Sequence, residues 1–203
     1  MTDDERRDFL ERALVAATEA ARYYSFNPAI AAAQSALESN WGQSQLAREA
    51  MNLKGIKSGR SWTGPTIELP TREYREADDE WYTTMATWRK YDSWEHAFRD
   101  YGALIERVYP HAATLADYPR QFLEALVSGQ LKYATDPAYV AKVWRIVEQY
   151  DMLAMQPTDN DDWRIIVYDS DNEITANVTI AAGATILTRV DPEHRRVHVR
   201  PDD

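Results

Sequence analysis

One stretch of the sequence carries a residue that could transfer a proton. It reads QSALESNWG from Gln34 to Gly42, and Glu38 lies near the C-terminal end of an alanine-rich segment. The small side chains predict a buried central helix. Desolvation beside apolar walls favours the protonated form of a carboxyl, which is the form that a general acid needs. Glu38 is therefore a candidate proton donor, and a solvated glutamate at a helix end is the plainer alternative.

Composition limits the class of protein. The chain has 203 residues, 44% of them hydrophobic and 28% charged, which is typical of a globular protein with one domain or one domain plus a small appendage. The absence of cysteine excludes a disulfide framework, a thiolate nucleophile and a cysteine-based zinc site. The net charge of −10, without a clustered basic face, argues against a nucleic-acid partner.

The elements that must position Glu38 are mostly helical. Asn27 and Ser44 are typical N-caps, and Asp92 with Glu95 predicts a capping box before a further helix. Apolar residues at spacings of three and four support the same elements. Helices are predicted at 5–24, 28–42, 44–51, 94–108, 119–128 and 135–150.

β-rich sequence occurs at two places. Segments 66–74 and 80–91 are rich in β-branched and aromatic residues and flank a polar connector, which predicts a β-hairpin. Residues 156–162 are typical of a linker, and 163–203 predicts a small all-β module of short strands. The module could recognise the substrate, bind a partner or form oligomers.

Five sequence blocks follow one another between about residues 9 and 153: AQSALESNWGQS, NLKGIKSG, TREY, WRKYDSWEHAFRDY and KYATDPAYVAKVWRIVEQY. In this order they resemble the peptidoglycan β-N-acetylglucosaminidases of glycoside hydrolase family 73, which include bacterial autolysins. The resemblance implies an α+β, lysozyme-like catalytic domain over 1–155, whose helical lobe faces a β-hairpin lobe (about 60–91) across a groove. Lys54 and Trp88 depart from the family pattern, which usually has an aromatic residue and Phe at these positions.

The resemblance also implies roles for single residues. Glu38 would protonate the oxygen between N-acetylglucosamine and N-acetylmuramic acid, and Glu73 would be the second carboxylate. Tyr133 would orient the acetamido group or a water. An inverting mechanism needs the two carboxyl groups about 6.5–9.5 Å apart, whereas direct attack by the second carboxylate needs them about 5–5.5 Å apart. In a third route the acetamido group of the substrate is the nucleophile. The alternative for Glu73 is an exposed hairpin glutamate without a catalytic role. The alternative for Tyr133 is a tyrosine that only packs against its neighbours.

Aromatic residues are candidates for contact with sugar rings. The substrate-binding candidates are Trp41, Trp62, Tyr91 and Tyr139, although a core position is the simpler interpretation of the two tyrosines. No cofactor and no metal are expected. His194 and His198 lie in an alternating segment, and strand geometry would hold them about 13 Å apart, too far to bind one ion.

The sequence therefore predicts a hydrolase acting on the glycan strands of peptidoglycan. A muramidase or lytic transglycosylase is the chemical alternative, and a non-catalytic wall-binding or structural protein on the same scaffold is the alternative of another class. We expect no membrane insertion, because no apolar stretch is long enough. The N-terminal segment lacks a signal-peptide pattern, so we expect synthesis in the cytoplasm and action on the wall after endolysin-like release or dedicated export. The sequence leaves the oligomeric state open.

Overall fold

The computed structural model describes residues 1–75, 80–155, 162–168, 174–180 and 196–202. For Glu73, Tyr74, Trp81 and the strands after 161, the description covers the backbone. The chain divides into two compact units, Met1–Gln156 and Pro157–Asp203, which are described separately.

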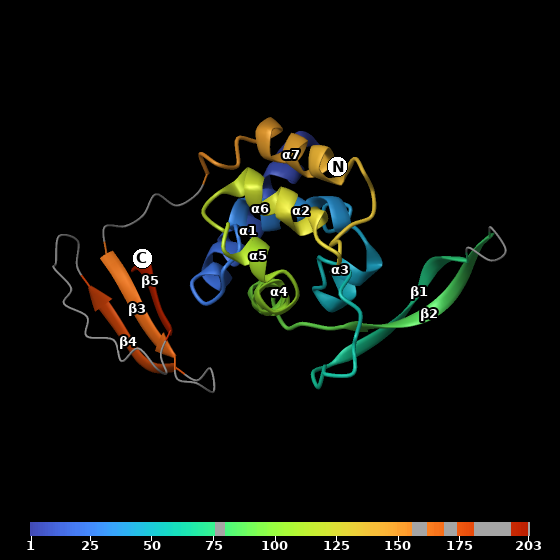
Figure 1. Cartoon of the computed structure of the whole chain (residues 1–203). Helices are drawn as coiled ribbons and strands as arrows, with labels where there is room; N and C mark the ends of the chain where they lie inside the picture. The colour runs from blue at the N-terminus through green and yellow to red at the C-terminus, as the bar shows by residue number, and fades with distance from the viewer. Residues whose placement is uncertain (76–79, 156–161, 169–173, 181–195, 203) are drawn as a thin grey trace. The chain divides into compact units, whose positions relative to one another are not determined.

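The first unit is a mixed, helix-rich fold with one antiparallel hairpin (Figure 1). Its elements are α1 (Asp3–Ala21), α2 (Pro28–Glu38), α3 (Gln45–Ala50), β1 (Thr66–Arg75), β2 (Glu80–Arg89), α4 (Trp94–Val108), α5 (Pro110–Ala113), α6 (Pro119–Ser128) and α7 (Tyr139–Gln149). Helix α2 packs against α1, α6 and α7. The predicted combination of helices and a hairpin is thus confirmed.

Local capping signals decide where several helices begin. The Asn27 side chain accepts a hydrogen bond from the Ile30 amide at 3.0 Å, and Ser44 caps α3 in the same way. The predicted capping box at Asp92 is wrong, because Ser93 is the N-cap of α4 and its hydroxyl accepts from the His96 amide. The final helix also begins later than predicted, at Tyr139.

Helix α2 forms the centre of the hydrophobic core. Its residues from Ala29 to Ala36 are all buried, which confirms a buried central helix, although the helix ends at Glu38 and not at Gly42 as predicted. After α2 the chain turns through positive φ angles at Asn40, Trp41 and Gly42. At Gly42 a Cβ atom would lie 2.9 Å from the Phe9 ring, so a side chain there would collide with α1.

The hairpin is anchored at its base to α4. Thr66 pairs with Arg89 at one end of the ladder, and Arg75 pairs with Glu80 at the other. The Arg89 guanidinium donates to both carboxylate oxygens of Asp100 on α4. Both side chains are largely buried, so this ion pair fixes the hairpin base to the helices.

The second unit contains a three-stranded antiparallel sheet with the order β4-β3-β5 in its described part. Its strands are β3 (Asp162–Tyr168), β4 (Ile174–Ile180) and β5 (Arg196–Asp202). The predicted linker 156–162 lies outside the described residues except for Asp162, and so does part of the predicted all-β module, residues 181–195 included. Within the described parts of both units, none of the helices combines the length and the apolarity that crossing a bilayer would require.

Candidate active site

Glu38 is the last residue of α2, and its side chain is exposed. This differs from the desolvated position that the alanine-rich helix predicted. The reason is that burial of α2 ends at Ala36: Leu37 is half-buried, and the helix leaves the core with Glu38. The carboxyl does not face open solvent on all sides, however, because it lines a cavity.

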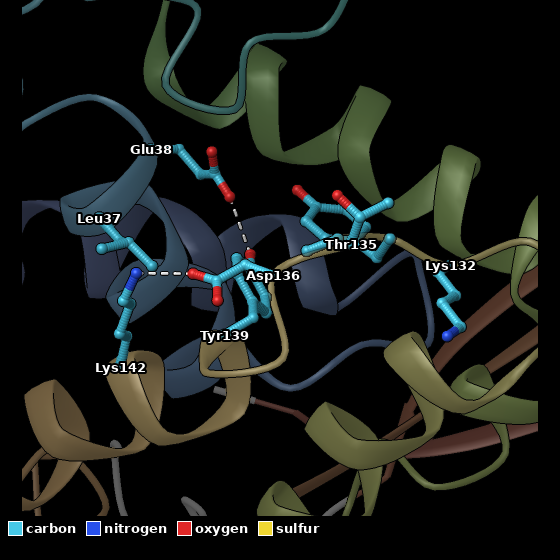
Figure 2. A pocket seen from close by; sticks show the side chains of 9 residues that line it. Leu37, Glu38, Lys132, Thr135, Asp136, Tyr139 and Lys142 are labelled. Atoms are coloured by element: carbon cyan, nitrogen blue, oxygen red, sulfur yellow. Dashed lines mark hydrogen bonds and ion pairs between the residues drawn. The ribbon is translucent and has the colours of Figure 1, made fainter. Parts of the chain in front are cut away.

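The cavity lies between the end of α2 and the segment that leads into α7 (Figure 2). Its volume is about 450 Å³. The described lining residues are Leu37, Glu38, Lys132, Tyr133, Ala134, Thr135, Asp136, Tyr139 and Lys142. Every one of them comes from α2 or from 132–142, so two segments far apart in sequence build the site.

A hydrogen bond joins the two walls at Glu38. The Tyr139 hydroxyl donates to Glu38 Oε1 at 2.9 Å (Figure 2). The same hydroxyl accepts from Gln34 Nε2 at 3.1 Å. Tyr139 is buried, as a core residue would be, yet its hydroxyl reaches the cavity. Burial raises the pKa of Tyr139, and the negative charge of Glu38 adds to that rise. The phenol therefore stays protonated and remains a donor to the carboxyl.

Tyr133 lines the same cavity from the opposite segment. Its ring lies within a group of tyrosines, with centroids 6.2 Å from Tyr101, 5.9 Å from Tyr109 and 6.0 Å from Tyr139. Burial raises the pKa of Tyr133, so its hydroxyl also stays neutral. The position accommodates both the predicted contact with substrate and the packing alternative.

Charged side chains stand at the rim of the cavity. Lys142 Nζ donates to Asp136 Oδ2 at 2.6 Å, and the Ala138 amide donates to Asp136 Oδ1 at 2.8 Å. These two hydrogen bonds, with that of Lys142 first, lower the pKa of Asp136. Asp136 is thus an ionised, hydrogen-bonded residue before α7 and does not compete with Glu38 as a proton donor. Lys132 is exposed on the same rim.

Glu73 lies on β1, opposite Tyr82 of β2 and two positions before the last described residue of that strand, Arg75. Its side chain is outside the described part of the structure, so its role as the second carboxylate stays a prediction. The described residues that line the Glu38 cavity include no part of the hairpin.

The remaining aromatic candidates lie away from this cavity. Trp41 is half-buried and packs edge-on against Phe9 and Tyr150, with centroids 6.3 and 5.5 Å apart. Trp62 is half-buried beside the hairpin base, 5.7 Å from the ring of Tyr91.

Tyr91 is buried, and its hydroxyl donates to Asp100 at 2.6 Å. That contact is the one expected of a core tyrosine with a polar tip. Among the residues whose positions are described, no three histidine or acidic side chains gather as a metal would require.

Comparison with known proteins then fixes the family. A family model described as glucosaminidase, mannosyl-glycoprotein endo-beta-N-acetylglucosaminidase, matches residues 14–152, which include the whole Glu38 cavity. The chain belongs to the glucosaminidase family. This confirms the resemblance seen in the sequence, and with it the class of glycoside hydrolases.

Relatives of this glucosaminidase-family chain carry names of wall hydrolases. Peptidoglycan hydrolase FlgJ of Salmonella typhimurium is 36% identical over 148 residues, which are 70% of this chain and 46% of that protein. A probable N-acetylmuramidase of Lactococcus lactis subsp. cremoris is 34% identical over 154 residues, 71% of this chain and 33% of that protein. The chain therefore spans less than half the length of these relatives.

Solved structures agree with the fold. The catalytic domain of the autolysin Auto from Listeria monocytogenes superposes with a TM-score of 0.66 at 28% identity, covering 76% of this chain and 89% of that one. The glycoside hydrolase domain of Salmonella typhimurium FlgJ superposes with a TM-score of 0.61 at 33% identity, covering 77% of this chain and 92% of that one.

Sequence reasoning missed several residues of the site. Gln34 precedes Glu38 by four positions, so the two lie on one face of α2. This spacing could have indicated that the Gln34 amide belongs to the Glu38 site. Lys142 and Lys132 carried no such signal, because their place at the rim depends on how the segment before α7 folds.

Proposed function

We propose that this chain hydrolyses the glycan strands of peptidoglycan at the β-1,4 bond between N-acetylglucosamine and N-acetylmuramic acid. The supporting observation is the Glu38 carboxyl at an open cavity, hydrogen-bonded by Tyr139, inside a glucosaminidase-family domain. In the proposed reaction the Glu38 proton passes to the bridging oxygen as the bond from the anomeric carbon to that oxygen breaks. A water oxygen becomes bonded to the anomeric carbon and loses its proton to a base.

The second carboxylate in this proposal is Glu73, within a lysozyme-like arrangement of a helical lobe and a hairpin lobe. Its support is the sequence TREY at the matching place of the family pattern and its position on β1. Inversion through Glu73 as base, direct attack by Glu73 and attack by the substrate's acetamido group differ in their products and intermediates. The anomeric configuration of the first product separates inversion from the other two routes.

A muramidase is the second candidate function, and the relatives named N-acetylmuramidase favour it. The decisive measurement is mass spectrometry of purified wall digested with the wild type, Glu38→Gln and Glu73→Gln. Reducing N-acetylglucosamine ends that disappear with Glu38→Gln support the proposal. Reducing N-acetylmuramic acid ends would identify a muramidase, and anhydro-muramic ends would identify a lytic transglycosylase. A wild type that binds the wall without releasing any product would indicate a non-catalytic protein.

A further inference from the structure

Lys54 is a buried lysine behind the active-site cavity. Only 7% of its surface is accessible, and its amine donates to the Ala31 carbonyl at 2.5 Å and to Gln34 Oε1 at 3.3 Å. The amine also lies 4.3 Å from the centre of the Tyr101 ring. The family resemblance implies an aromatic residue at this position, so the buried amine is a departure from that pattern.

The contacts of Lys54 continue to Glu38 through two side chains. Gln34 Oε1 accepts from Lys54 and, at 2.7 Å, from the Tyr101 hydroxyl. Gln34 Nε2 donates to the Tyr139 hydroxyl, and that hydroxyl donates to Glu38 Oε1. We call the side chains Lys54, Gln34 and Tyr139 the buried relay.

Lys54 gives the buried relay its direction. A tyrosine hydroxyl can donate or accept, so Tyr101 alone would tolerate either orientation of the Gln34 amide. An ammonium group has donors and no acceptor, and it therefore requires the amide oxygen on its side. Burial lowers the pKa of Lys54, and the charge of Glu38 opposes that lowering. A neutral amine would have two hydrogens for its two acceptors, Ala31 and Gln34, and a lone pair besides, so the constraint on the Gln34 amide is strict for the ammonium form, which the charge of Glu38 favours.

We propose that Lys54 is a positioning residue that, through Gln34 and Tyr139, keeps the acidic proton of Glu38 on Oε2. With the Gln34 amide nitrogen facing Tyr139, the phenol must turn its own hydrogen to Glu38 Oε1. An oxygen that already accepts a hydrogen bond is the poorer place for the proton, so Oε2 holds it for the substrate. This inference rests on the proposed role of Glu38 as the general acid.

The test measures kcat and KM on soluble glycan oligosaccharides for Lys54→Met, Tyr139→Phe and the double variant. Met keeps the volume and removes the donor, so Gln34 can flip and draw the Tyr139 hydrogen away from Glu38. We expect Lys54→Met to lower kcat about five- to tenfold with KM unchanged, as for loss of one hydrogen bond in the transition state. Because Lys54 acts through Tyr139, the double variant should be no slower than Tyr139→Phe alone.

Tyr150→Phe provides the matched control. Tyr150 is buried, and its hydroxyl donates to Asp3 at 2.8 Å, away from the cavity-lining residues. Its removal should leave kcat unchanged, alone or combined with Lys54→Met. Gln34→Glu is the second variant, in case Lys54→Met does not fold. Its carboxylate would accept the Tyr139 hydrogen, so its kcat should fall as far as that of Tyr139→Phe.

Two results would overturn the inference while the proposed function stands. One is a folded Lys54→Met or Gln34→Glu variant with the kcat of the wild type. The other is a Lys54→Met loss that multiplies fully with the Tyr139→Phe loss. If instead Glu38→Gln hydrolyses glycan as fast as the wild type, the general-acid assignment fails and the inference fails with it.

Discussion

Tyr139 donates a hydrogen bond of 2.9 Å to Glu38, across 101 positions of sequence. This bond connects the first residues of α7 to the last residue of α2, which are the two walls of the cavity. The Glu38 carboxyl is exposed, and the hydroxyl of a buried tyrosine restrains one of its two oxygens.

Replacing Glu38 with Gln should lower kcat about 10²- to 10⁴-fold, because the amide has no acidic proton to transfer. Release of reducing ends from purified wall measures the loss. Glu49→Gln is the control, since Glu49 is an exposed helical glutamate that pairs with Gln45 on α3. The prediction fails if the two variants have equal rates.

Replacing Tyr133 with Phe tests whether its hydroxyl contacts the substrate. A hydroxyl that orients the acetamido group or a water should cost about tenfold in kcat/KM when removed, with little change in thermal stability. Tyr109→Phe removes a hydroxyl from a neighbouring, half-buried ring and should leave the rate unchanged. A Tyr133→Phe variant with full activity would leave only a packing role.

Breaking the buried ion pair at the hairpin base should destabilise the first unit. Removal of one partner leaves the other charge buried, which costs about 3–5 kcal/mol, so Arg89→Met should lower the free energy of unfolding by that amount. Arg120→Met breaks an exposed pair with Glu124 and should cost about 0–1 kcal/mol. Urea unfolding followed by tryptophan fluorescence compares the two variants. Equal losses would show that Asp100 does not need Arg89.

The first unit should lose stability in alkali. Burial raises the pKa of Tyr101, Tyr133 and Tyr139 in the folded state above the usual value near 10. A tyrosine whose pKa is higher in the folded state than in the unfolded state stabilises the fold. This stabilisation is complete below the pKa of the unfolded state and is lost as the pH rises above that value. Unfolding free energy measured from neutral pH to about pH 12 should therefore fall from about pH 10 upward.

Tyr101→Phe supplies the comparison for this pH series. It removes one of the buried phenols, so its stability should decline less steeply with pH than that of the wild type. Tyr118→Phe removes an exposed hydroxyl and should keep the wild-type slope. A wild-type curve that is flat up to about pH 12 would contradict the prediction.

Local signals made much of the fold predictable. Asn27 before Pro28, and Ser44 before α3, cap their helices as expected because an N-cap bond involves only residues three positions apart. The same kind of signal gave a wrong prediction at Asp92, because the adjacent Ser93 is the N-cap of α4.

The site was predictable only in part. Glu38 was singled out because its segment has a distinctive composition, yet its hydrogen bond comes from Tyr139, 101 positions away. Tyr139 was interpreted as a core residue or a sugar contact, and the bond to Glu38 shows that burial of its ring and access of its hydroxyl coexist. Tertiary contacts of this range carry no local sequence pattern.

The cavity walls come from α2 and from 132–142, so the order of synthesis matters. Glu38 is translated early, whereas Tyr139 and Lys142 are translated only after most of the first unit. A nascent or prematurely terminated chain that ends before this segment would thus have the Glu38 carboxyl without the second wall of its cavity.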